Sequence, residues 1–220
     1  SRGLGDVYKR QIYTNGKQSG KKNTFHIEFP NYFTASSFYM HITKKDRLPT
    51  ENFNYTSIVT GKVLPVILYG KSKWGISGVK RKTLKYLAEL ESNFGAWSHP
   101  SLTIYIAGMG GMEHSGATIT SERALGHELT HSYFARGVMP ISGNSGWMDE
   151  AIASWRDKGY KSSRSPNFSS SNMSSHSEYR RYTDKLAYTQ GASFMAYLNH
   201  RIKDIGGLTS FLSHLHTEYT

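Results

Sequence analysis

The chain contains no cysteine. This absence excludes disulfide bonds and thiolate metal ligands, so any zinc site has to be built from histidine and carboxylate side chains. Long apolar runs are missing too, because no stretch approaches the roughly 18 residues that a membrane-spanning helix needs. We therefore expect no membrane span in the visible chain. The lack of cysteine says little about compartment, so the localisation stays unknown.

Acidic residues are scarce: Asp and Glu number 16 against 27 Lys and Arg, which gives a net charge of +11. Much of the basic excess lies in residues 69–87. A basic patch can bind nucleic acid or anionic lipid, but no nucleic-acid-binding signature accompanies this charge. We interpret the stretch as a solvated helix face and expect no nucleic-acid partner.

Neither end of the chain has the features of a natural terminus. The first residue is not Met, the last residues lie within a helical pattern, and residues 1–11 show no strand or helix period. Residues 1–11 also resemble an adapter-derived tail, so we expect them to be non-native or unstructured. We expect a β-rich segment at residues 12–70, interpreted as the end of an N-terminal β-domain. Residues 71–220 are then a catalytic domain that is truncated at its C-terminus.

Alternating and apolar runs predict strands, and amphipathic runs between capping residues predict helices. The expected strands are at residues 23–30, 36–43, 62–70 and 101–108, the last leading into a glycine-rich turn at 108–116. The expected helices are at residues 77–95, 121–136, 147–158, 184–205 and from 209 onward. We expect Ser77 to cap the first helix and Gly95 to end it. The serine-rich stretch 162–177 predicts a flexible loop, whose role stays open.

The motif HELTH places His127 and His131 four positions apart on the helix expected at 121–136. At about 3.6 residues per turn, both side chains project from the same face, one turn apart. Two imidazoles so placed can occupy two corners of a zinc tetrahedron. Glu128 is turned about 100° around the helix from His127, so it flanks the metal and can act on the metal's water.

A third metal ligand is expected from the next helix. Residues 132–149 separate His131 from Glu150, which is enough chain to turn back toward the metal. Two neutral histidines and one glutamate leave a net positive zinc with an open position for water, as a catalytic site requires. This ligand set favours one Zn2+ ion over cobalt or manganese. Asp157, two turns after Glu150, either accepts the outer N–H of a zinc histidine or is an ordinary surface carboxylate.

The motif HELTH, the 18 residues after it and the run WMDEAIASW resemble the HExxH-x18-E signature of gluzincin peptidases, specifically the aminopeptidase N-type family. That family commonly has a W-L-N-E-G-F-A run around its glutamate ligand, so Met148, Asp149 and Ala151 are departures at non-ligand positions. The resemblance implies an α+β fold. It would be a thermolysin-like catalytic domain with a small mixed sheet and zinc-binding helices, preceded by the remnant of an all-β domain.

Two further segments are similar to that family. The run GGMEHSGA looks like its G-[AG]-M-E-N motif. This likeness implies that Glu113 binds the substrate's free α-amino group and that the backbone at Gly111 and Met112 lies alongside the peptide. The run AYTQG looks like its Y-x-K-G segment, which implies that Tyr188 donates to the oxyanion of the tetrahedral intermediate. The ordinary alternatives are that Glu113 caps a turn and that Tyr188 packs within a helix.

The resemblance implies a zinc aminopeptidase in which Glu128 is the general acid and base, with a peptide that has a free N-terminus as its partner. Two departures concern the substrate pocket: only 13 residues separate Glu113 from the HELTH motif, and Gln190 replaces the usual Lys. The alternative is a thermolysin-like zinc endopeptidase with His214 or His216 stabilising the oxyanion. A structural zinc is a third interpretation, but no fourth ligand is evident. The preferred N-terminal residue and the oligomeric state stay open.

Overall fold

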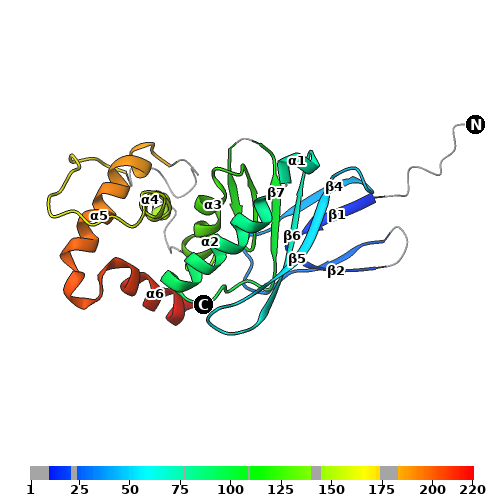
Figure 1. The fold of residues 1–220 in the computed structure, drawn as a ribbon, viewed down its shortest axis with the longest axis horizontal. Coiled ribbons are helices and arrows are strands. Elements are labelled where there is room, and N and C mark those ends of the chain that lie inside the picture. Colours follow the sequence, from blue (N-terminus) through cyan, green and yellow to red (C-terminus); the bar gives the residue numbers. More distant parts are fainter. Residues whose placement is uncertain (1–9, 21–23, 77, 109, 140–144, 174–182) are drawn as a thin grey trace, which may run out of the picture.

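The computed structural model describes residues 10–20, 24–76, 78–108, 110–139, 145–173 and 183–220. Its first part is built of strands and its last part of helices, and Figure 1 shows the N-terminal strands and helices α4 to α6 at opposite ends of the molecule. The expected division into a β-rich segment at residues 12–70 and a catalytic domain at residues 71–220 stays a prediction. None of the helices in the described ranges combines the length and the apolar character needed to cross a bilayer.

Four short strands form two antiparallel pairs at the N-terminal end. Strand β1 (Arg10–Thr14) pairs with β4 (Met40–Lys44), and β2 (Lys17–Ser19) pairs with β3 (His26–Glu28). Strands β3 and β4 lie in two of the expected strand regions, whereas β1 and β2 were not predicted. The first two residues of β1 belong to the stretch 1–11, for which we expected no structure; residues 1–9 lie outside the described residues.

A five-stranded mixed sheet forms the centre of the molecule, in the order β5-β6-β7-β9-β8. Its strands are β5 (Thr50–Thr56), β6 (Val63–Gly70), β7 (Leu102–Ile106), β8 (Met112–His114) and β9 (Ala117–Thr120). Strands β6, β7 and β9 are parallel, while β5 and β8 are antiparallel edges. Strands β6 and β7 confirm two expected strands. The expected glycine-rich turn at 108–116 is wrong in part, because this stretch contains the edge strand β8.

Helices α1 (Lys73–Ile76) and α2 (Val79–Phe94) connect β6 to β7. Helix α2 confirms the helix expected at 77–95, and Gly95 ends it at a φ of 96° with its N–H donated to the Glu91 carbonyl. Such a positive φ is what glycine tolerates at a helix C-terminus. The N-cap is Gly78 rather than the expected Ser77, which lies outside the described residues.

The remaining helices follow the central sheet. They are α3 (Leu125–Phe134), α4 (Gly146–Asp157), the π-helical turn η3 (Ala187–Gly191), α5 (Ala192–Arg201), the 3-10 turn η4 (Lys203–Ile205) and α6 (Gly207–Tyr219). Helices α3 and α4 confirm the predicted pair that carries the metal motif. The single helix expected at 184–205 is instead divided into η3, α5 and η4. Residues 161–173 of the serine-rich stretch contain neither helix nor strand.

One apolar core joins the sheet to the helices. Leu68 and Ile104 of the sheet, Leu87 of α2, Leu129 of α3 and Trp155 of α4 are all fully buried in it. A second cluster on the β-rich side contains Tyr13, Tyr39, Tyr69 and Ala117. Helix α3 packs between the sheet and α4. Burial of one leucine in this core contributes roughly 1.5–3 kcal/mol to the stability of the fold.

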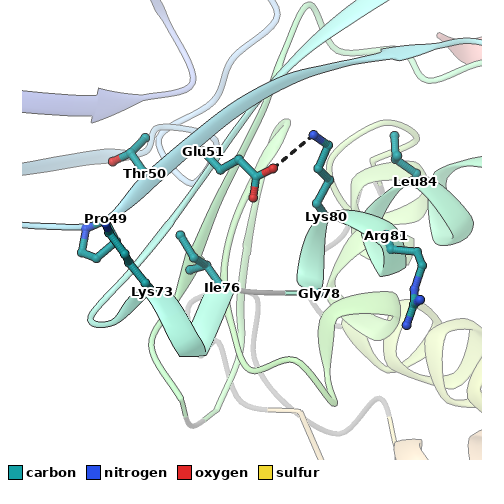
Figure 2. Close-up of a pocket in the computed structure, with 9 residues that line it drawn as sticks. All are labelled: Pro49, Thr50, Glu51, Lys73, Ile76, Gly78, Lys80, Arg81 and Leu84. Carbon is teal, nitrogen blue, oxygen red and sulfur yellow. Dashed lines mark ion pairs between the residues drawn. The ribbon is translucent and has the colours of Figure 1, made fainter.

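Figure 2 shows that Lys73, Lys80 and Arg81 of the basic stretch line an open cavity of about 630 Å³, together with residues 49–51. Ion pairs join Lys80 to Glu51 at 3.1 Å and Lys82 to Glu122 at 2.6 Å. These pairs involve side chains that are close to half exposed, so each contributes little to stability. The stretch thus carries a solvent-exposed face with partly compensated charge, in agreement with the interpretation from sequence.

Two buried histidines lie outside the HELTH motif. His99 hydrogen-bonds the Ser132 carbonyl through Nε2 at 2.9 Å and Tyr32 through Nδ1 at 3.1 Å. His216 packs against the ring of Tyr133, at 4.7 Å between ring centroids. Burial lowers the pKa of each histidine to about 4. Both are therefore neutral in the folded chain at pH values where an unfolded chain would protonate them.

We expect His99 and His216 to lower the free energy of unfolding as the pH falls from about 6.5 to about 4. In this pH window each histidine is protonated in the unfolded state and neutral in the folded state. Each therefore lowers the free energy of unfolding by roughly 1–3 kcal/mol at about pH 4, and has no such effect above about pH 6.5. Urea unfolding of the metal-free protein in chelator, at pH 7.5, 5.5 and 4.5, measures the change. His99→Gln should flatten the dependence and the exposed control His214→Gln should not. Equal slopes in both variants would contradict the assignment.

Candidate metal centre

Helix α3 carries the HELTH motif with one face in the core and the other toward α4. Leu125, Leu129 and Tyr133 are buried in the core at intervals of four residues, which leaves His127 and His131 together on another face. The two imidazole rings lie 4.8 Å apart between centroids and nearly perpendicular, at 78°. The sequence expectation that both histidines share one face is therefore met by the geometry of α3.

Glu150 of α4 meets the two imidazoles. Its Oε2 lies 3.0 Å from Nε2 of His127 and 3.6 Å from Nε2 of His131. A tetrahedral zinc with bonds of about 2.0–2.2 Å separates its ligand atoms by about 3.3 Å, so both of these distances fit a zinc site. His127, Glu128 and His131 also have ligand atoms within 4.8 Å of one another.

The outer nitrogens of both histidines face aspartates. Nδ1 of His127 lies 2.7 Å from Oδ2 of Asp157, and Nδ1 of His131 lies 2.5 Å from Oδ1 of Asp149. A proton on each Nδ1 is thus directed at a carboxylate, which leaves the lone pair on Nε2 facing Glu150. Of the two alternatives for Asp157, the structure shows the histidine partner. The contact between Asp149 and His131 was not predicted from the sequence. The position of Asp149 directly before Glu150 on the same helix was the one feature that could have indicated it.

The charges around the two imidazoles favour a cation at this place. Burial lowers the pKa of His127, but hydrogen bonds to Asp157 and Glu150 outweigh it and raise the pKa to about 9. Burial likewise lowers the pKa of His131, and the nearby charge of Asp149 is the largest effect that raises it, to about 10. Two lone pairs and a carboxylate that meet at one point require positive charge between them, either protons or a metal. The residues present therefore fit a zinc ion.

A glycine allows α4 to approach α3 beside the candidate ligands. A Cβ at Gly126 would overlap with the guanidinium of Arg156. That guanidinium binds both carboxylate oxygens of Glu89 on α2, at 2.9 and 2.6 Å, and reaches Oδ1 of Asp157 at 3.1 Å. Sequence reasoning missed this connection, which extends from α2 through Arg156 and Asp157 to His127.

Glu128 lies in a confined space next to the edge strand. Its side chain is 6% exposed, and burial raises its pKa to about 7 against the lowering effect of His131 and His127. A Cβ at Gly111 would overlap with Oε1 of Glu128, so a side chain at this position would displace the Glu128 carboxylate. The next residue, Met112, is 47% exposed at the start of β8.

Glu113 lies within β8, opposite Thr118 of β9, rather than capping a turn. Its Oε1 accepts a hydrogen bond from Nη2 of Arg136 at 2.6 Å. Burial raises the pKa of Glu113, but the positive charges of His131 and Arg136 outweigh this effect, and the pKa is lowered overall. The carboxylate is therefore ionised and already holds one cationic partner.

Tyr188 of the π-helical turn η3 reaches the site from the other side. Its hydroxyl donates to Oε1 of Glu150 at 2.6 Å, and its ring stacks on His127 at 6.0 Å and 15°. A Cβ at Gly191 would overlap with Ala151, so this glycine lets η3 lie close to α4. The structure brings Tyr188 to the candidate ligands, with its hydroxyl on a ligand carboxylate rather than free.

Gln190, the replacement for the family's usual Lys, contacts the serine-rich stretch. Its Oε1 accepts hydrogen bonds from the hydroxyls of Ser169 and Ser171, at 3.2 and 3.3 Å. These bonds connect the stretch to the turn that carries Tyr188.

The two histidines of the endopeptidase alternative lie on α6. His214 lines a cavity with Ser92 and Asn93 of α2, and His216 packs against Tyr133. Within the part of the chain that the structure describes, neither is among the side chains that contact the candidate ligands. The structure therefore does not bring them to the site.

No protein-family model matches the chain, and no curated protein matches it. Solved structures do match. A mutant M1 zinc metallopeptidase from Deinococcus radiodurans, bound to a Tyr-Ser-Ala substrate, has a TM-score of 0.71 and 16% identity, with 96% of this chain and 54% of that chain covered. An aminopeptidase A from Legionella pneumophila, in complex with aspartic acid, has a TM-score of 0.64 and 14% identity, with 95% and 29% covered.

An aminopeptidase N family protein from Idiomarina loihiensis also matches, with a TM-score of 0.60, 17% identity, and 97% of this chain and 48% of that chain covered. The chain has the fold of the M1 zinc metallopeptidases. It spans about 54–55% of the length of the Deinococcus proteins. The expected α+β class, with helices beside a small mixed sheet, is confirmed, and the sheet has five strands. The specific thermolysin-like domain arrangement stays a prediction.

We expect Asp149→Asn and Asp157→Asn each to weaken zinc binding by about 10- to 100-fold. Each change removes the carboxylate that holds a histidine Nδ1–H and so frees the imidazole to turn away from the metal. Competition with a chromophoric chelator measures the affinity. The exposed Asp204→Asn is the matched control and should bind zinc like the parent chain. Unchanged affinity in both variants would show that these carboxylates do not orient the imidazoles for the ion.

Proposed function

We propose that the chain is the core of a zinc-dependent aminopeptidase, with His127, His131 and Glu150 as the metal ligands. The observation that carries this proposal is the convergence of both Nε2 atoms on Oε2 of Glu150, at 3.0 and 3.6 Å, beside the buried Glu128. The M1 fold supports the same assignment. Zinc bound there would supply Lewis acidity, which activates water and polarises the scissile carbonyl.

Glu128 is the general base and then the general acid. Burial brings its pKa to about 7, so it can accept a proton from the attacking water and release it to the leaving amine near neutral pH. Tyr188 is the oxyanion donor in this proposal. Its hydroxyl starts on Glu150 and needs only to turn toward the substrate to donate there.

The edge strand β8 positions the peptide. Among the described residues it pairs with β9 alone, so its other edge can pair with an extended peptide. The backbone at Gly111 and Met112 passes next to Glu128, and Glu113 follows within the same strand. A substrate ammonium on Glu113 places the first peptide bond, rather than an internal one, at the general base. This contact distinguishes an aminopeptidase from the endopeptidase alternative.

We expect the zinc-loaded chain to cleave a short peptide with a free amino terminus and to spare its acetylated form, because only the free form offers an ammonium to Glu113. Mass spectrometry of the products, with and without chelator, measures both. Glu128→Gln should retain zinc and lose about 10²- to 10⁴-fold in rate. Equal cleavage of both peptides at internal bonds would replace the proposal by the endopeptidase. No loss of rate with chelator would remove the role of the metal.

We expect Gly111→Ala to lower the rate by about 10²-fold or more while zinc binding is retained, since the added methyl group displaces Glu128 rather than a metal ligand. Gly75→Ala, at an exposed helical glycine of α1 where a methyl group would meet only the Ser72 hydroxyl, at 3.1 Å, is the control for the substitution itself. Full activity in Gly111→Ala would contradict the role of Glu128. Loss of zinc would instead indicate a wider collapse of the site.

A further inference from the structure

Arg136 is a buried cation next to the candidate amine anchor. It lies in the turn after α3, where its backbone N–H donates to the His131 carbonyl at 3.0 Å, and only 5% of the residue is exposed. Its Nη2 donates to Oε1 of Glu113 at 2.6 Å, and its Nη1 donates to Oγ of Ser36 at 2.7 Å. One guanidinium therefore connects the metal helix, the edge strand β8 and the segment between β3 and β4.

The pairing engages only one end of the Glu113 carboxylate. In the described ranges, Arg136 is the only side chain that hydrogen-bonds Glu113, and the bond is to Oε1. A carboxylate has about four acceptor positions, so Oε2 can still accept N–H donors from a ligand. Charge-assisted bonds of this length are strong and directional, and the planar guanidinium is held at its other end by Ser36. The direction of the Glu113 carboxylate is thus set from outside the strand that carries it.

The electrostatic surroundings make this pairing necessary. The negative charge of Glu113 faces those of Glu128 and Asp149, and it acts on the pKa of both. An unpaired carboxylate in this partly buried place would turn away from the acidic groups or take up a proton, and either change would remove it as a partner for an ammonium. Arg136 provides opposing charge together with His131, and of the two it is the one that hydrogen-bonds the carboxylate.

We propose that Arg136 is a positioning residue that acts through Glu113. It holds the carboxylate ionised and oriented by Oε1, and it leaves Oε2 for the ammonium of the substrate's first residue. The assignment rests on the aminopeptidase function proposed above. The alternative is that Arg136 only stabilises the fold, as many buried ion pairs do.

Ligand binding tests the assignment without requiring turnover. Calorimetry would compare L-phenylalanine amide with its N-acetyl form on the zinc-loaded parent chain and on Arg136→Gln, Arg136→Lys and Glu113→Gln. We expect the parent to bind the free amine at least about tenfold more tightly and Arg136→Gln to lose most of this preference. Arg136→Lys should retain part of it. Affinity for the acetylated ligand should stay the same throughout.

The double variant decides between positioning and structural roles. If Arg136 acts through Glu113, adding Arg136→Gln to Glu113→Gln should change the preference by less than about twofold, because contacting residues are not additive. A full additional loss would overturn the proposal, as would an unchanged preference in Arg136→Gln. The exposed Arg123→Gln is the control, and zinc content and thermal melting are measured for each variant. Should Arg136→Gln not fold, an unchanged preference in Arg136→Lys would overturn the proposal instead.

Failure of the inference differs from failure of the proposed function. A parent chain that binds the free and acetylated amides equally would remove Glu113 as the amine anchor, and both proposals would fall. A parent chain that prefers the free amide, with an Arg136→Gln variant that keeps the preference, would leave the aminopeptidase intact and remove only the role of Arg136.

Discussion

The candidate site depends on the balance of charge around two imidazoles on α3. Three carboxylates from α4 hold them: Asp157 and Asp149 at the outer nitrogens and Glu150 at the inner ones. Such a group of acceptors is stable only with positive charge at its centre, which protons on the two imidazoles or a bound metal ion can supply. The same requirement explains why two acids at the site have arginine partners. Arg156 pairs with Asp157, and Arg136 pairs with Glu113.

Three glycines let this arrangement form. A side chain at Gly126 would collide with Arg156 of α4, one at Gly191 with Ala151, and one at Gly111 with Glu128. Each glycine therefore lies where a second element reaches the metal helix or its partner helix: α4, the turn η3 and the edge strand β8. Protein interiors are packed densely enough that a single methyl group at such a contact displaces its neighbour. The positions of the candidate site residues therefore depend on these contacts between elements and not on any one helix.

Sequence reasoning succeeded where the signals are local. Helices α2, α3 and α4 lie within one to four residues of their expected bounds, because caps, glycines and apolar periodicity act over a few positions. It failed for β8, which was expected to be a turn, because a three-residue strand is formed by its pairing with β9 and not by its own residues. The helix expected at 184–205 was broken for a similar reason. The π-helical turn η3 lies against α4, and the apolar periodicity of residues 184–205 does not indicate this contact.

By itself, the sequence determined that two histidines share one helical face, that a glutamate follows on the next helix, and that no thiolate can take part. These points follow from helix geometry and from composition, and neither depends on contacts with other elements of the fold. The tertiary structure alone decided which side chains complete the site. Asp149, Arg136 and Arg156 contribute through contacts with residues 18, 23 and 67 positions away in the chain. Their roles depend on how strands and helices pack against one another, and no local pattern encodes that packing.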